Sequence, residues 1–176
     1  MTQDDGLIGN FRLLAAYNRG ANRLLYEACA QLSEDELNKP RPAFFKSIHG
    51  TLNHILLGDR NYLARFGGAN PSAANLDAIL YDDFDELRAA RSEQDASIDE
   101  FTATLTTSVL ERTISYVNHQ GLAFADPIRL LLPHLFNHQT HHRGQIHDLL
   151  TQTNVAPPSL DMHRVLKPTP ETVLSF

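Results

Sequence analysis

The chain has 176 residues, enough for one domain with a buried core, and we expect a single domain over residues 1–176. Its formal net charge of −6 and its lack of a lysine or arginine run disfavour nucleic-acid binding, because phosphate contacts need a basic surface. The single cysteine excludes an intramolecular disulfide, and no stretch is apolar enough for a signal peptide or a membrane span, so we expect a cytoplasmic protein without a membrane partner.

Apolar residues recur at helical spacing from about residue 7 to 32, which predicts a first long helix. Asn18 and Asn22 lie four residues apart near its apolar face. They can line a pocket or hydrogen-bond a neighbouring helix, and we favour the structural role because buried polar groups usually have partners. Ser33 and Glu36 then form a capping-box pattern, which predicts a short extra turn.

Two further helices are predicted over about 47–66 and 83–107. The first of them follows a break that contains two prolines. The second begins with acidic residues, which helix N-termini favour. Its apolar face is interrupted by a charged middle, so we expect that part of the helix to face water.

Alternating apolar residues between 112 and 125 predict a small β-hairpin, with an exposed His119 in its turn. The last helix is predicted over 126–150. An Asp-Pro pair at its start is typical of a helix cap followed by the first helical position. The tail over 152–176 is expected to be irregular.

Five of the nine histidines fall between residues 133 and 147. On a helix, His134, His138 and His142 form one stripe, with neighbouring Cβ atoms about 5–6 Å apart. Two imidazoles at this spacing can bind one metal ion. Gln139 stands where a peptidase of the HExxH type has its glutamate, so the pattern indicates a metal site and disfavours that chemistry.

A catalytic site of the zinc type usually takes three protein ligands, so a third must come from elsewhere in the chain. His54 is the candidate, because Gly50 and Gly58, one turn to either side, leave room beside its ring. From spacing alone three others stay open: His49, His119 and His163.

His54 in the second helix and the run Asn137–Ile146, Asn-His-Gln-Thr-His-His-Arg-Gly-Gln-Ile, together resemble the DinB/YfiT-like family of metal-binding four-helix bundles. The first helix is also similar over Ala16–Asn22. The resemblance implies an all-α fold, a four-helix bundle with a small β-hairpin before the last helix. It also implies that His54, His138 and His142 bind one divalent metal ion.

Other residues are candidates for contacts that support the three histidines. His134 stays open as a contact to the metal or its water. His141 is expected beside a ligand or exposed, and Gln145 to hydrogen-bond a ligand or pack between helices. Arg143 is expected to hold a carboxylate such as Asp59. Asn22 remains the candidate from the first helix if a pocket lies there.

Three neutral imidazoles leave the charge of the ion uncompensated, so the metal can act as a Lewis acid on water or on a thiol. The absence of acids between Pro127 and His147 counts against a di-iron carboxylate site. The resemblance implies a homodimer and a metal-dependent hydrolase, or a transferase using a small thiol such as bacillithiol or mycothiol. We therefore expect a thiol S-transferase or hydrolase with one zinc or nickel ion. The alternative is a non-catalytic stress protein with a structural metal.

Overall fold

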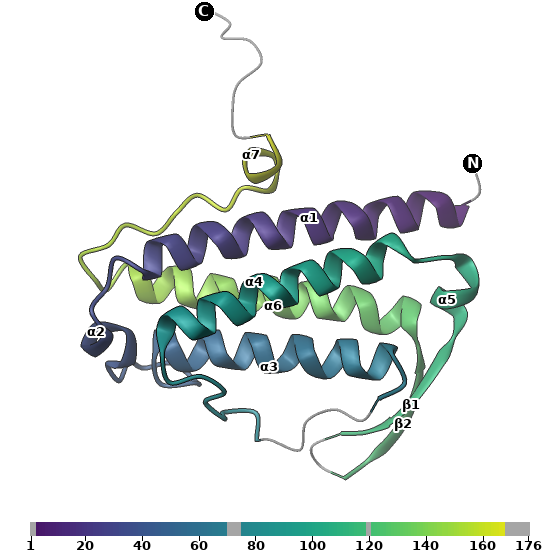
Figure 1. Cartoon of the computed structure of the whole chain (residues 1–176), viewed down its shortest axis with the longest axis horizontal. Coiled ribbons are helices and arrows are strands. Elements are labelled where there is room, and N and C mark those ends of the chain that lie inside the picture. The colour runs from purple at the N-terminus through teal and green to yellow at the C-terminus, as the bar shows by residue number, and fades with distance from the viewer. Residues whose placement is uncertain (1–2, 70–74, 119–120, 168–176) are drawn as a thin grey trace, which may run out of the picture.

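A computed structural model describes residues 3–69, 75–118 and 121–167 of the chain. Four long helices run side by side in it (Figure 1): α1 (Gln3–Cys29), α3 (Ile48–Phe66), α4 (Phe84–Ala103) and α6 (Ile128–Leu150). The described short elements are α2 (Glu34–Asn38), α5 (Thr107–Glu111), β1 (Thr113–Val117), β2 (Ala123–Pro127) and α7 (Met162–Leu166). The antiparallel pair β1–β2 directly precedes α6. This arrangement confirms the predicted all-α fold with a hairpin before the last long helix.

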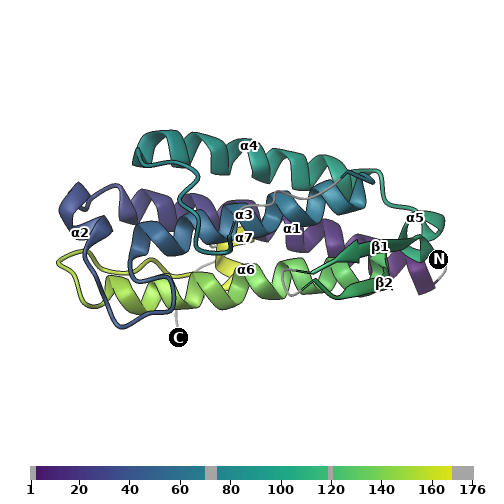
Figure 2. The ribbon, with the colours of Figure 1, turned by 90° about the horizontal axis from the view of Figure 1, so that it is seen from below.

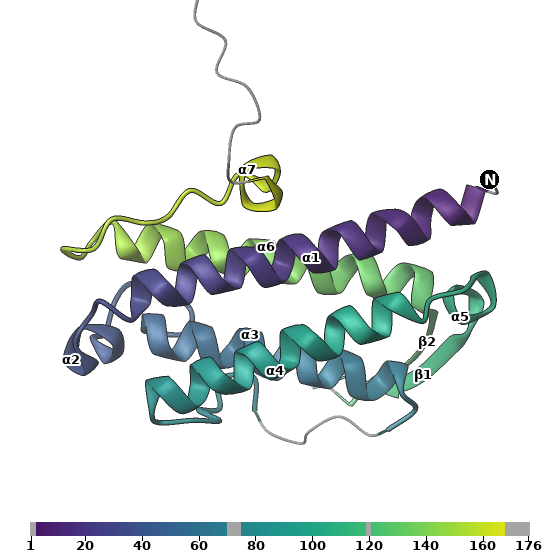
Figure 3. The same cartoon turned by 45° about the horizontal axis from the view of Figure 1, so that its top comes forward.

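Each long helix packs against two others: α1 contacts α4 and α6, and α3 contacts the same two helices. Seen from below, α4 and α6 therefore form opposite sides of the bundle (Figure 2). The hairpin lies at the end where α3 finishes and α6 begins (Figure 3). Of the helices in the described ranges, none is long and apolar enough to cross a membrane.

Side-chain caps explain where several helices begin. Each capping oxygen accepts a hydrogen bond from a backbone amide three residues later, which satisfies one of the free donors of the first turn. The pairs are Ser33 with Glu36, Ser47 with Gly50, Asp83 with Glu86, and Thr106 with Val109. The short extra turn predicted from Ser33 and Glu36 is thus confirmed by α2, in which the Glu36 carboxylate pairs with Lys39 and Arg41.

The core consists of two apolar clusters separated by polar residues. One cluster lies at the α2 end and includes Leu25, Leu52 and Leu149, while the other lies at the hairpin end and includes Phe11 and Phe136. On every long helix, buried polar residues occupy the positions between the two clusters. We call them the polar layer: Asn18, Asn22, Asp59, Arg91, Asp95, Gln139 and Arg143.

The charged middle of α4 was expected to face water in part. Arg88 and Glu93 do so, but for Arg91 and Asp95 the prediction is wrong. Arg91 is 2% exposed and Asp95 is 4% exposed. Burial is possible there because both residues find partners of opposite charge or complementary polarity inside the bundle.

Helix ends and the tail also differ from the prediction. α1 begins at Gln3 and ends at Cys29, and α4 ends at Ala103. α6 begins only at Ile128, because Pro127 is still paired with Thr113 in the hairpin.

The tail, expected to be irregular, contains α7, which packs against α1. Tyr17 Oη donates to the carbonyl oxygen of Leu160 over 2.9 Å. A Cβ at Gly20 would stand 2.6 Å from Val165 Cγ1, so this glycine allows the close approach of α7. The predicted turn residue His119 lies outside the described residues.

Candidate metal centre

Three imidazoles from two helices meet on one side of the bundle. His54 comes from α3, and His138 and His142 come from successive turns of α6. One nitrogen of each ring can act as a ligand, and these atoms all lie within 4.8 Å of one another. His54 Nε2 and His138 Nε2 are 3.0 Å apart. Nitrogens bound to one zinc ion at about 2.0–2.1 Å lie at comparable spacing, so the three residues can hold a metal ion.

Hydrogen bonds orient two of these rings. His54 Nδ1 lies 2.7 Å from the carbonyl oxygen of Leu76, which only accepts, so Nδ1 carries the proton and the Nε2 lone pair is free. His142 Nδ1 lies 2.7 Å from Gln145 Oε1, which has the same consequence for His142. The amide nitrogen of Gln145 then faces His141 Nε2 at 3.1 Å. Such outer contacts fix the tautomer and the direction of a metal-binding imidazole.

Phe45 covers one face of the candidate site. Its ring stacks on His54 with centroids 3.7 Å apart and meets His142 edge-on at 5.5 Å. Lys46, with a φ of 68°, takes the left-handed conformation that turns the chain directly after Phe45. Phe45 is thereby buried against the histidines, whereas Phe44 remains 76% exposed.

The two glycines of α3 make room, but for other neighbours than the sequence suggested. A Cβ at Gly58 would stand 2.8 Å from His138 Cε1, so Gly58 admits the ring that comes from α6. A Cβ at Gly50 would stand 2.4 Å from the carbonyl oxygen of Phe45, so Gly50 admits the turn before α3.

The three imidazoles are in an environment that favours their neutral form. Burial lowers the pKa of His54 to about 4, despite the hydrogen bond to Leu76. Burial and the neighbouring His142 lower the pKa of His138 to about 3, and burial also lowers the pKa of His142. At neutral pH all three rings are therefore uncharged, as a metal ligand must be.

Two residues of the polar layer, Gln139 and Arg143, lie on α6 itself, next to the candidate ligands. Arg91 contacts Asp59 at 2.5 Å and Asp95 at 2.9 Å. Gln139 donates from its amide to Asp59, and the guanidinium of Arg143 donates to Gln139 Oε1 over 3.1 Å. Gln139 follows His138 and Arg143 follows His142 in the sequence, so the layer anchors the α6 backbone at both ligand positions.

Charge balance makes this burial tolerable. Two arginines face two aspartates, and Asn22 of α1 donates to Asp95 and accepts from Arg143. Burial still raises the pKa of Asp59 to about 6, against the lowering effect of Arg91. Arg143 was expected to hold Asp59 directly; instead Arg91 does so, and Arg143 reaches it through Gln139.

His134, His141 and Asn22 were candidates for contacts near the metal, and the structure places each of them differently. His134 is exposed, packs near Tyr62 at 5.3 Å between centroids, and is not a member of the three-histidine group. His141 is exposed and contacts Gln145. Asn22 donates to Asp95 over 2.9 Å and accepts from Arg143, so it belongs to the polar layer and not to the surroundings of the histidines.

Two of the alternative third ligands have other surroundings. His49 Nε2 lies 2.8 Å from the carbonyl oxygen of Tyr81, and His163 is exposed on α7. Sequence reasoning missed the carbonyl of Leu76, because a backbone atom carries no residue signature. It also missed the pairing of Arg91 with Asp59, which joins residues 32 positions apart.

Comparison with known proteins identifies relatives of this chain. The DinB family model matches residues 1–173 of the chain. The protein named DinB from Bacillus subtilis (strain 168) is 25% identical over 152 residues, which cover 84% of this chain and 88% of that protein. A crystal structure of a DinB-like protein from Bacillus cereus ATCC 10987 has the same fold, with a TM-score of 0.55 at 18% identity, covering 79% of this chain and 89% of that one. Because the family match extends over almost the whole sequence, this protein belongs to the DinB family.

Proposed function

We propose that the chain binds one divalent metal ion through His54, His138 and His142 and uses it to activate a small substrate. The observation that carries this proposal is the convergence of three imidazole nitrogens within 4.8 Å. In His54 and His142 the other ring nitrogen is already occupied by a hydrogen bond. Imidazole ligands suit zinc and nickel, and we propose one of these two metals.

The reaction we propose is thiol S-transfer or hydrolysis. A divalent ion held by three neutral ligands supplies Lewis acidity, which makes a thiol or water easier to deprotonate. The chain contributes the orientation of the rings, and Phe45 shields the face of His54 from water. Gln139, beside His138, is an amide that cannot accept a proton and is bonded to Asp59. This favours a thiol cosubstrate, which loses its proton more readily than water and needs no protein base.

The alternative is a metal site without catalysis. The three histidines come from α3 and α6, so an ion bound to them would tie these two helices together. A fourth ligand position filled by a protein side chain would favour this structural role. An open position accessible to small molecules would favour the enzyme.

Metal content tests the ligand assignment. The full chain is purified without metal-affinity resin, and bound metal is measured by mass spectrometry for His54→Ala, His138→Ala and His142→Ala. We expect each variant to lose most of its metal. His147→Ala is the matched control on α6, because His147 contacts the carbonyl oxygen of Pro158 instead of the site. If all three variants keep a full equivalent, the assignment is wrong.

Cobalt substitution tests the substrate class. Glutathione, bacillithiol, mycothiol and coenzyme A are titrated into the cobalt-loaded chain, and at least one should produce a sulfur-to-cobalt charge-transfer band. If no thiol produces a band, but ester or amide turnover is seen and disappears in His138→Ala, the protein is a hydrolase. Without a band or turnover, the structural alternative stands.

We also propose that the chain forms a homodimer, as its resemblance to other members of the family implies. Light scattering at micromolar concentration should report twice the chain mass of 19.7 kDa. A monomer under these conditions would remove the dimer without affecting the fold or the metal site.

A further inference from the structure

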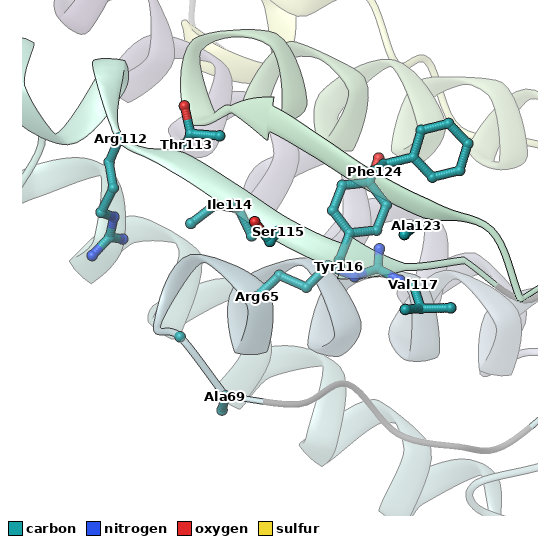
Figure 4. Close-up of a pocket in the computed structure, with 11 residues that line it drawn as sticks. Arg65, Ala69, Arg112, Thr113, Ile114, Ser115, Tyr116, Val117, Ala123 and Phe124 are labelled. Carbon is teal, nitrogen blue, oxygen red and sulfur yellow. The ribbon is translucent and has the colours of Figure 1, made fainter.

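A cavity lies at the C-terminal end of α3, where that helix meets the hairpin (Figure 4). Its volume is about 700 Å³, within the range of small-molecule sites. Arg65 lines this cavity and follows His54 by eleven residues on the same helix. At 1.5 Å per residue the two positions are ~16 Å apart, so the cavity is separate from the three histidines.

Two arginines line the cavity, and no aspartate or glutamate of the described residues does. The Arg65 guanidinium carbon lies 4.7 Å from the ring centroid of Tyr116 and 5.3 Å from that of Tyr62. Arg65 Nε is enclosed and has no hydrogen-bond partner. Arg112 donates to the carbonyl oxygen of Phe66 through one nitrogen. Both cations are therefore contacted by neutral groups, and the enclosed Nε of Arg65 has no partner among the described residues.

The nearby carboxylate of Asp126 does not compensate these cations directly. It accepts a hydrogen bond from Tyr116 Oη over 2.9 Å, and it is not among the lining residues. Neither Arg65 nor Arg112 forms an ion pair with a carboxylate of the described residues. An uncompensated pair of guanidinium groups in one cavity favours an anionic occupant.

A second cavity of the same chain differs in the charge of its lining residues. This cavity, of about 660 Å³, lies between α1 and α4 and is lined by four arginines. Each of those arginines faces a carboxylate: Arg19 with Asp99, Arg23 with Glu27, Arg88 with Asp85, and Arg91 with Asp59 and Asp95. That cavity is internally neutralised, and the one beside the hairpin is not.

The other walls of the hairpin cavity are largely apolar. The rings of Tyr116 and Phe124 stack with centroids 5.7 Å apart. Figure 4 shows the side chain of Arg65 extending from α3 toward Tyr116, which lies next to Phe124. Val117 and Ala123 extend the apolar wall toward the tip of the hairpin, and Ser115 adds a hydroxyl. Apolar walls with a few charged groups are typical of sites that bind a hydrophobic body through an anionic end.

We propose that this cavity binds a small organic carboxylate with an aromatic body. The carboxylate pairs with the guanidinium group of Arg65, and the aromatic body packs on Tyr116 and Phe124. Arg112, at the far end of β1, adds positive charge to the cavity. The proposal is independent of the metal site, because none of the described lining residues belongs to the candidate centre.

Nuclear magnetic resonance titration of the full chain with naphthalene-2-carboxylate tests this site. We expect saturable shifts of amide signals confined to the C-terminal turns of α3 and to the hairpin. Naphthalene-2-methanol, the neutral analogue, should bind at least about tenfold more weakly, because a charged hydrogen bond is lost. Equal binding of the neutral analogue, or shifts confined to other elements, would overturn the proposal.

Variants separate a true site from general loss of structure. Arg65→Gln should weaken carboxylate binding about tenfold or more. Arg112→Gln should weaken it less, because Arg112 lies at the far end of β1. Ser115→Glu adds a repelling carboxylate at an exposed position without removing an arginine, and it should abolish binding. If Ser115→Glu binds the probe as the native chain does, the cavity is not the site.

Two controls complete the experiment. Arg88→Gln removes the same charge from the surface of α4 and should leave binding unchanged. His138→Ala should also retain binding, although it removes a proposed metal ligand. Loss of binding in His138→Ala would assign the probe to the metal and contradict the proposal.

Discussion

Arg91 on α4 lies against Asp59 on α3, with Nη1 2.5 Å from Oδ2 and neither side chain more than 3% exposed. Asp95 approaches the same guanidinium from the next turn of α4. This pairing joins α3 to α4, and Gln139 extends it to α6. The position of the candidate metal ligands on α6 therefore depends on a balance of charge inside the bundle.

Removing the cation of this pair should strongly destabilise the fold. In Arg91→Met the volume is largely kept, but Asp59 and Asp95 lose their buried partner. We expect the free energy of unfolding to fall by about 3–5 kcal/mol, measured by urea denaturation. Arg88→Met is the matched control, because Arg88 is an exposed arginine of the same helix and should cost at most about 0.5 kcal/mol. Equal losses in the two variants would contradict the role of the buried pair.

Asp59 should give the stability a distinct pH dependence. Its pKa is raised from 3.8 to about 6 in the folded chain, so its ionisation is less favourable after folding. Asp59 therefore stabilises the fold fully below about pH 4. This stabilisation, about 3 kcal/mol, is lost as the pH rises toward 6.

To isolate this effect, the unfolding free energy of Asp59→Asn is subtracted from that of the native chain at each pH. The subtraction is needed because His54 and His138, with lowered pKa values, act in the opposite direction. We expect the difference in unfolding free energy to fall between about pH 4 and 6 and to stay level above. A difference that rises over this range would refute the raised pKa.

Gly58→Ala should weaken metal binding without weakening the fold. The new Cβ would stand 2.8 Å from His138 Cε1, so the ring must move away from its neighbours. The same substitution favours the helix by up to about 1 kcal/mol. We expect metal affinity to fall about tenfold or more, measured by competition with a chelator, while the urea midpoint is kept. Gly144→Ala on α6 meets no atom within 4 Å and should leave affinity unchanged.

Gln145→Leu tests the outer contact of His142. Loss of the Oε1 acceptor removes the hydrogen bond that fixes the protonated Nδ1. Affinity for the metal should fall by about 10–100-fold, as judged by the same chelator competition. Gln152→Leu, at an exposed position after α6, is the control, and a variant of Gln145 with native affinity would show that the contact has no effect on binding.

The long helices and the hairpin were predictable because their signals are local. Apolar spacing and capping residues such as Ser33 act within one or two turns, and the structure follows them closely. The tail helix α7 was not predictable in this way. It depends on contact with α1 at Gly20, about 145 residues earlier in the chain.

The sequence predicts some residues of the candidate site better than others. His138 and His142 share a helix, so their spacing alone brings them together. His54 required the family resemblance, since spacing left His49 equally available. Only the fold shows that His49 is directed to the carbonyl oxygen of Tyr81. The burial of Arg91 was missed for a related reason, because its compensating carboxylate at Asp59 belongs to another helix.

The burial of Cys29 bears on how sulfur chemistry at the site can be observed. This residue is the single cysteine of the sequence, is fully buried in the apolar cluster at the α2 end, and has its pKa raised by that burial to about 12. Its thiol is therefore protonated and enclosed at neutral pH. Met1 and Met162 carry thioethers, which cannot form a thiolate. Any thiolate sulfur that X-ray absorption detects beside the metal must consequently come from an added molecule. The native chain thus serves as its own thiolate-free background.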